Sequence, residues 1–121
     1  MRKNKRVFAW QYMDGKKIFK YYWEEMGTAR SCSKLAKWCK SEGMSNPITG
    51  KSPTTMAVWF SMWRWAIRNQ TEAYQIYNKA LSDLGLFISD VEWKVIIDDK
   101  ASVCLNKKSY DKFRREYGYT S

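Results

Sequence analysis

The sequence predicts a mainly α-helical protein, and three observations favour this fold class. Apolar residues recur in most segments at the i, i+3, i+4 and i+7 spacing of one helix face. Ser52 and Ser89 stand where helices should begin, while Gly27, Gly43 and Gly85 stand where helices should end. The 121 residues contain no internal repeat and no long linker. We therefore expect residues 1–121 to form a single domain of packed helices.

The N-terminal segment allows two interpretations after a polar cationic arm, Met1 to Arg6. Asp14 and Gly15 between alternating aromatic runs are typical of a hairpin over residues 7–23. A helical spacing competes with it and is carried by Phe19, Tyr22, Trp23 and Met26. We favour an extended segment up to Met13 followed by a helix from about Lys16 to Met26, with a small N-terminal hairpin as the alternative.

The next segment, from Thr28 to Gly43, predicts a short amphipathic helix. Its apolar stripe consists of Cys32, Leu35, Trp38 and Cys39. Its opposite side carries Arg30, Lys34, Lys37 and Ser41. This helix should therefore be apolar toward the core and cationic toward solvent.

A longer helix should run from Pro53 to about Asn69, with Ser52 as N-cap and proline at the first helical position. At 100° per residue its side chains fall on three faces. The core stripe is Met56, Trp59, Phe60, Trp63 and Ile67. A second apolar side, to be covered by the C-terminal helices or by another subunit, is Val58, Met62 and Trp65. The third face, expected to be exposed, is Thr54, Ala57, Ser61, Arg64 and Arg68.

Three further helices complete the prediction. Residues 71–85 place Ala73, Ile76, Tyr77, Ala80 and Leu84 on one face. Ser89 and Glu92 have capping-box spacing and start a helix from about Asp90 to Lys100, although residues 91–97 also alternate as a strand would. The last helix spans residues 106–117 and carries Tyr110, Phe113 and Tyr117 on one side.

The charge is distributed unevenly along the chain. The net charge is +10, and residues 1–70 contain 14 lysines and arginines against 4 acidic residues, whereas residues 71–121 contain 8 of each. The chain thus divides into a basic half and a neutral helical half. A one-sided positive field indicates a polyanionic partner, first nucleic acid and second an anionic membrane.

The third face of the central helix has the residue types that a DNA major groove accepts. Small and hydroxylic side chains come first, where a helix approaches base edges, and arginines follow, where they can bind guanine or phosphate. The candidate base-reading residues are Thr54, Thr55, Ala57, Ser61, Arg64 and Arg68. The candidate phosphate-binding residues are Arg30, Lys34, Lys37 and Lys51.

Two stretches, GTARSCSKLAKW and SPTTMAVWFSMWRWAI, resemble the supporting and recognition helices of the trihelical helix-turn-helix DNA-binding superfamily. The resemblance covers about residues 16–69 and rests on pattern alone. It implies a helix-turn-helix core followed by additional C-terminal helices. The loop between the two helices has eight or nine residues where three or four are typical.

The leading functional hypothesis is a sequence-specific binder of double-stranded DNA. It would be a small transcriptional regulator or a DNA-recognition subunit of a phage or mobile element. Val58, Met62 and Trp65 would form a homodimer or larger complex. One alternative is an RNA or single-strand binder that uses exposed aromatic residues such as Trp10, Tyr12 and Tyr21. Another is a protein-interaction module without affinity for nucleic acid.

Several function classes find little support in the sequence. The chain has no histidine, which removes histidine-based catalysis and histidine metal sites. Cys32, Cys39 and Cys104 form no CxxC pair, so we expect reduced thiols and no zinc ribbon. We expect no cofactor, no metal and no enzymatic activity; the catalytic alternative is a nuclease built from Asp90, Glu92, Asp98 and Asp99. No apolar run approaches a membrane span, and we expect a cytoplasmic, nucleoid-associated protein.

Overall fold

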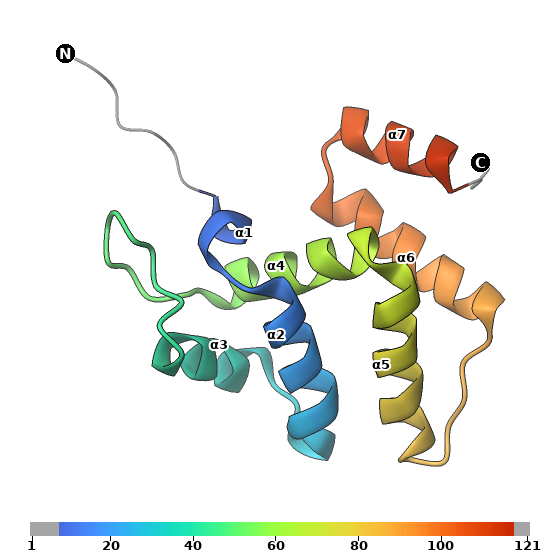
Figure 1. The fold of residues 1–121 in the computed structure, drawn as a ribbon, viewed down its shortest axis with the longest axis horizontal. Coiled ribbons are helices and arrows are strands. Elements are labelled where there is room, and N and C mark those ends of the chain that lie inside the picture. The colour runs from blue at the N-terminus through green and yellow to red at the C-terminus, as the bar shows by residue number, and fades with distance from the viewer. Residues whose placement is uncertain (1–7, 118–121) are drawn as a thin grey trace.

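A computed structural model describes residues 8–117, apart from the side chain of Thr28, and shows a mainly helical protein (Figure 1). The elements in order are α1 (Ala9–Tyr12), α2 (Gly15–Lys20), the π-helical turn η1 (Tyr21–Glu25), the 3-10 turn η2 (Gly27–Ala29), α3 (Cys32–Ser41), α4 (Thr55–Arg68), α5 (Gln70–Ser82), α6 (Asp90–Cys104) and α7 (Lys107–Glu116). No strand occurs among these residues, so the mainly α fold class is confirmed. The predicted cationic arm, Met1 to Arg6, lies outside the described residues.

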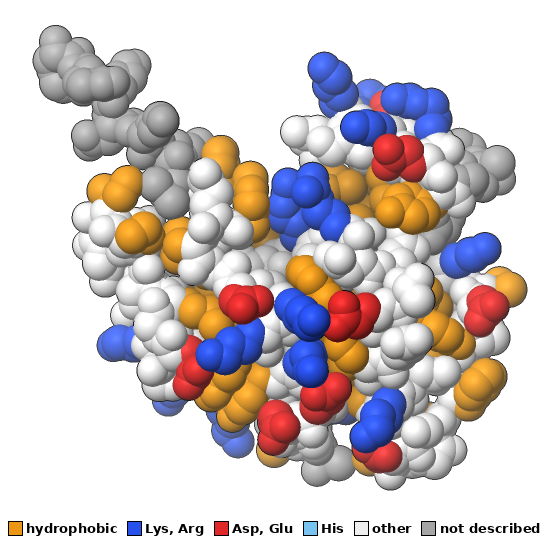
Figure 2. Space-filling model, in the orientation of Figure 1, with side chains coloured by type: hydrophobic (Ala, Val, Ile, Leu, Met, Phe, Trp, Pro, Cys, Tyr) orange, Lys and Arg blue, Asp and Glu red, His pale blue; other side chains and the backbone are white. Residues whose placement is uncertain are grey.

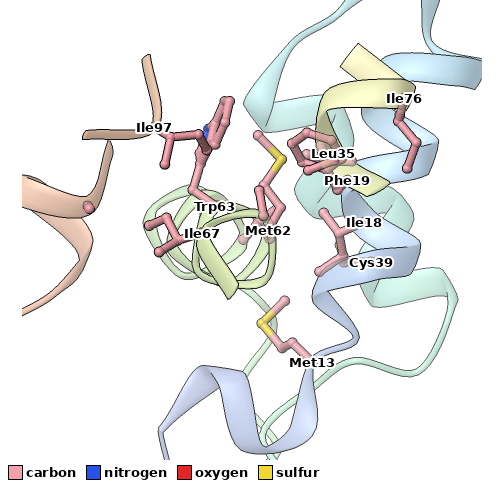
Figure 3. Close-up of a cluster of buried hydrophobic side chains, with 14 of the residues drawn as sticks. Met13, Ile18, Phe19, Leu35, Cys39, Met62, Trp63, Ile67, Ile76 and Ile97 are labelled. Atoms are coloured by element: carbon pink, nitrogen blue, oxygen red, sulfur yellow. The ribbon is translucent and has the colours of Figure 1, made fainter. Parts of the chain in front are cut away.

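Helix α4 occupies the centre of the molecule. Helices α1, α2, α3, α5 and α6 all pack against α4, while α7 packs on α6. Figure 3 looks nearly along the axis of α4 and shows core side chains approaching it from several directions, with Ile97 on one side and Ile18 and Phe19 on another. This central position explains why α4 has more apolar surface than a helix with one buried stripe.

The surroundings of α4 correct two of its predicted faces. Val58 is 0% exposed and Met62 is 1% exposed, because α2 and α3 cover the second apolar side within the same chain. Trp65 is partly buried, with its ring 5.5 Å from the ring of Phe19. The prediction that these residues form a homodimer surface is therefore wrong. Met56, predicted to be core, is 63% exposed.

The N-terminal segment differs from both interpretations of the sequence. Residues 9–12 form a helical turn, so the extended segment up to Met13 is wrong, and the described part of residues 7–23 contains no hairpin. Asp14 is the N-cap of α2, where its carboxylate accepts a hydrogen bond of 3.1 Å from the backbone N–H of Lys17. The predicted helix from Lys16 to Met26 is confirmed as the continuous stretch of α2 and η1.

Gly15 lies where α2 crosses α4. A Cβ atom at this position would lie 2.5 Å from the backbone oxygen of Ser61 and 2.7 Å from the Cβ of Trp65. The Asp14-Gly15 pair therefore serves a helix start and a close helix crossing, where the sequence pattern indicated a turn between strands.

The remaining helices follow the sequence pattern closely. Helix α4 begins two residues later than expected, because Thr54 and not Ser52 is its N-cap and accepts a hydrogen bond from the N–H of Ala57 at 3.1 Å. The capping box of Ser89 and Glu92 is confirmed at the start of α6. The strand alternative for residues 91–97 is wrong, because this stretch lies inside α6.

The three cysteines are free, as expected. We predict that iodoacetamide at neutral pH alkylates Cys39 and Cys104 only after unfolding, because the thiolate is the reactive form. Burial raises the pKa of Cys39 to about 12 and that of Cys104 to about 11. Mass spectrometry of peptides from protein labelled with and without urea measures this protection. Labelling of Cys39 in the folded protein at the rate of free cysteine would contradict it.

Candidate nucleic-acid interface

The predicted base-reading face of α4 is covered at its middle and exposed at its two ends. Ser61 is 3% exposed, and its Oγ donates a long hydrogen bond of 3.7 Å to the sulfur of Met13. Ala57 and Arg64 are partly buried, whereas Thr54, Thr55 and Arg68 are exposed. The prediction of an exposed face is wrong for Ser61, because α1 and the residues after it pack on this side of α4.

The predicted phosphate-binding residues lie on another part of the molecule. Lys34, Lys37 and Lys51 are exposed. Arg30 is partly buried and lies over the Trp23 ring, with Cζ 4.5 Å from the ring centroid. Figure 1 shows α3 on one side of α4, with α1 and α7 on the other. The candidate base-reading residues Ser61 and Arg64 and the candidate phosphate-binding lysines of α3 therefore lie on different sides of α4 and form no common surface.

Arg64 instead faces an aromatic residue of α1. Its Cζ lies 4.2 Å from the ring centroid of Trp10, a cation–π contact. Burial, and secondly the charge of Arg68, lower the pKa of Arg64. The two guanidiniums thus repel each other. Neither forms an ion pair with a described residue.

Arg64 and Arg68 belong to a cleft of about 300 Å³ between α4 and α7. Lys112 lines it from α7, together with Ser109, Glu116 and Tyr117. Lys112 also has no ion pair among the described residues. Figure 2 shows Lys and Arg side chains gathered at the base of the hollow between α1 and α7 and along α7. The cleft therefore has three cations and one carboxylate.

Lys112 is a site residue that the sequence pattern did not indicate. Residues 71–121 are neutral as a whole, but five of the ten residues of α7 are Lys or Arg. Two of these five are paired: Lys107 with Asp111 at 3.4 Å, and Arg114 with Asp98 at 3.9 Å. Counting charge over ten-residue windows would have identified α7 as basic. Counting over halves of the chain hides the positive charge of α7, because acidic residues elsewhere in residues 71–121 cancel it.

Two of the four candidate nuclease carboxylates, Glu92 and Asp98, have structural partners. Glu92 accepts hydrogen bonds from the backbone and hydroxyl of Ser89, and these bonds lower its pKa. Asp98 accepts a hydrogen bond of 2.9 Å from the hydroxyl of Tyr110. Within residues 8–117 no group of three His, Cys, Asp or Glu side chains is placed to hold a metal ion.

Comparison of the chain with protein-family models, curated proteins and solved structures found no match. The resemblance to the helix-turn-helix superfamily therefore stays a prediction. In the part of the chain that the structure describes, no helix combines the length and apolar character needed to cross a bilayer.

Proposed function

We propose that this protein binds nucleic acid and holds the phosphate backbone of a single strand in the cleft between α4 and α7. The observation that carries the proposal is the cluster of Arg64, Arg68 and Lys112, none of which forms an ion pair with another residue in the stretch 8–117. Guanidinium groups bind phosphate oxygens through paired charge-assisted hydrogen bonds. Cations that repel one another gain most from an anion that neutralises them together.

The aromatic edge of the cleft favours a single strand. Trp10 is 45% exposed and contacts Arg64, which lines the cleft. Single-strand sites combine a cationic groove with aromatic side chains close to it. Of the other aromatic residues predicted for this role, Tyr12 and Tyr21 are partly buried, and Tyr21 stacks on Trp38 at 3.9 Å. Trp10 stacks on Phe8 at 4.5 Å but is the most exposed of the three, so we assign the role to Trp10.

Duplex DNA is the second candidate, and helix α7 favours it. Two residues, Leu105 and Asn106, separate α6 from α7, and the exposed side of α7 carries Lys108, Lys112 and Arg115. A basic helix after a tight turn is a feature of proteins that enter a DNA groove. A transcriptional regulator or DNA-recognition subunit would belong to this candidate, with Thr54, Thr55 and Arg68 as the α4 residues exposed enough to reach DNA.

Removing two of the cations tests whether the cleft binds the phosphate backbone. We expect the double variant Arg68→Gln and Lys112→Gln to bind a labelled single strand more weakly. We also expect the plot of log affinity against log salt concentration to become less steep, by about 1.4 on a single strand or about 1.8 on a duplex, because two phosphate contacts are lost. Fluorescence anisotropy at several salt concentrations gives both quantities. The same oligonucleotide as DNA, as RNA and as a duplex identifies the preferred strand.

Helix α3 provides the matched control. Lys34→Gln with Lys37→Gln removes the same charge from the exposed side of α3. We expect this pair to leave the salt slope unchanged. An equal decrease from both pairs would assign binding to net charge alone, and a larger decrease from the α3 pair would move the interface to the predicted phosphate-binding lysines.

A further inference from the structure

A second cavity, of about 270 Å³, lies among η1, α4, α5 and α6. Its walls are mostly aromatic, and no acidic residue lines it. The lining includes five aromatic residues and one lysine: Tyr22, Trp23, Trp59, Trp63, Tyr77 and Lys100. None of them lines the cleft between α4 and α7, so this cavity is independent of the proposed nucleic-acid interface.

The walls are fixed by contacts among the rings themselves. Trp23 meets Tyr77 edge to face at 4.5 Å and meets Tyr22 in the same way at 5.0 Å. Trp63 is held against Phe19 of the core at 5.4 Å. Ring pairs of this geometry are favourable, and a cavity with fixed walls loses little entropy when a flat ligand enters.

Lys100 places a positive charge at this cavity. Its Nζ lies 5.1 Å from the ring centroid of Trp59 and 5.2 Å from that of Trp63. Lys100 forms no ion pair with a described residue. The ammonium group has aromatic faces beside it and no anion, so its three hydrogen-bond donors can serve a ligand.

Trp23 lines the cavity but its indole N–H does not face it. Its Nε1 is buried and makes no hydrogen bond among the described residues. Because this nitrogen has almost no accessible surface, a ligand in the cavity cannot reach it, and Trp23 contributes only its ring to the wall. Trp93 Nε1 has the same property, but Trp93 does not line this cavity.

The backbone at this place is also unusual. Tyr22 and Trp23 belong to η1, a five-residue π-helical turn. Single π turns within helices are rare and occur frequently at functional sites. Here the π turn sets the two side chains that form one wall of the cavity.

We propose that this cavity is a binding site for a small planar aromatic carboxylate. The ring would lie among the indole and phenol walls, while the carboxylate would accept a hydrogen bond from Lys100 Nζ. Lys100 supplies a positive charge and the lining has no carboxylate, so the cavity favours an anion over a cation.

Calorimetric titration with naphthoate, and with naphthamide as its neutral counterpart, tests the charge requirement. We expect naphthoate to bind about tenfold or more tightly than naphthamide, the effect of one charge-assisted hydrogen bond. Lys100→Met should remove this preference while keeping the aliphatic stem. Lys94→Met, an exposed position on the same helix, should preserve it.

Nuclear magnetic resonance of the indole N–H groups tests whether the ligand occupies this cavity, without relying on the lysine variant. The Trp23 signal, assigned with Trp23→Phe, should shift when naphthoate is added, because an aromatic ring bound beside the Trp23 ring changes its chemical shift, and naphthamide should cause a comparable shift only at about tenfold or more higher concentration. Absence of naphthoate binding at millimolar concentration, equal binding of both compounds, an equal loss in Lys94→Met, or an unshifted Trp23 signal would each overturn the proposal.

Discussion

Met62→Ala will lower the free energy of unfolding by about 2–5 kcal/mol, the range for a buried methionine truncated to alanine. Met62 is 1% exposed and lies close to Leu35 and Phe19 in Figure 3. Met56→Ala, on the same helix, will change it by no more than about 0.5 kcal/mol, because Met56 is 63% exposed. Urea unfolding followed by tryptophan fluorescence measures both variants.

The two methionines exchange the roles that helical periodicity predicts for them. If Met56 were core and Met62 a subunit contact, Met56→Ala would be the costly substitution. The effect of Met62→Ala would then also depend on protein concentration, since a dimer is stabilised by mass action. A difference that is independent of concentration and larger for Met62 will support the observed packing.

Gly15→Ala will destabilise the protein by about 1–3 kcal/mol, the cost of overpacking a tight contact. Helix propensity alone predicts that Gly15→Ala stabilises the protein, because alanine is favoured over glycine inside a helix by about 1 kcal/mol. The close contacts are with the backbone oxygen of Ser61 and the Cβ of Trp65. Neither atom can rotate away, so α2 must move relative to α4.

Gly85→Ala is the contrasting variant. Gly85 has φ of +76° and open space around its missing Cβ, so its cost of about 1 kcal/mol comes from backbone strain alone. Circular dichroism during urea unfolding compares the two variants. We also expect Gly15→Ala to shift backbone resonances in both α2 and α4, whereas Gly85→Ala will shift only nearby ones. A stabilised Gly15→Ala protein would contradict the close helix crossing.

The sequence by itself determined where most helices lie. Apolar spacing located the stretch of α2 and η1 and helices α3 to α7, and the pair Ser89 and Glu92 located the start of α6. These signals are local, because helix hydrogen bonds and caps join residues three or four positions apart. The helical turn at residues 9–12 was not predicted, because four residues are too few to show a periodic pattern.

Only the tertiary structure decided which side of each helix is covered. Ser61 has the residue type of an exposed or base-contacting position, yet it is buried, and its backbone oxygen lies at the close approach of Gly15 on α2. Apolar periodicity identifies a stripe but not the helix that packs on it, because the hydrophobic effect has no direction. The cleft of Arg64, Arg68 and Lys112 likewise joins residues more than forty positions apart, and only the packing of the helices brings them together.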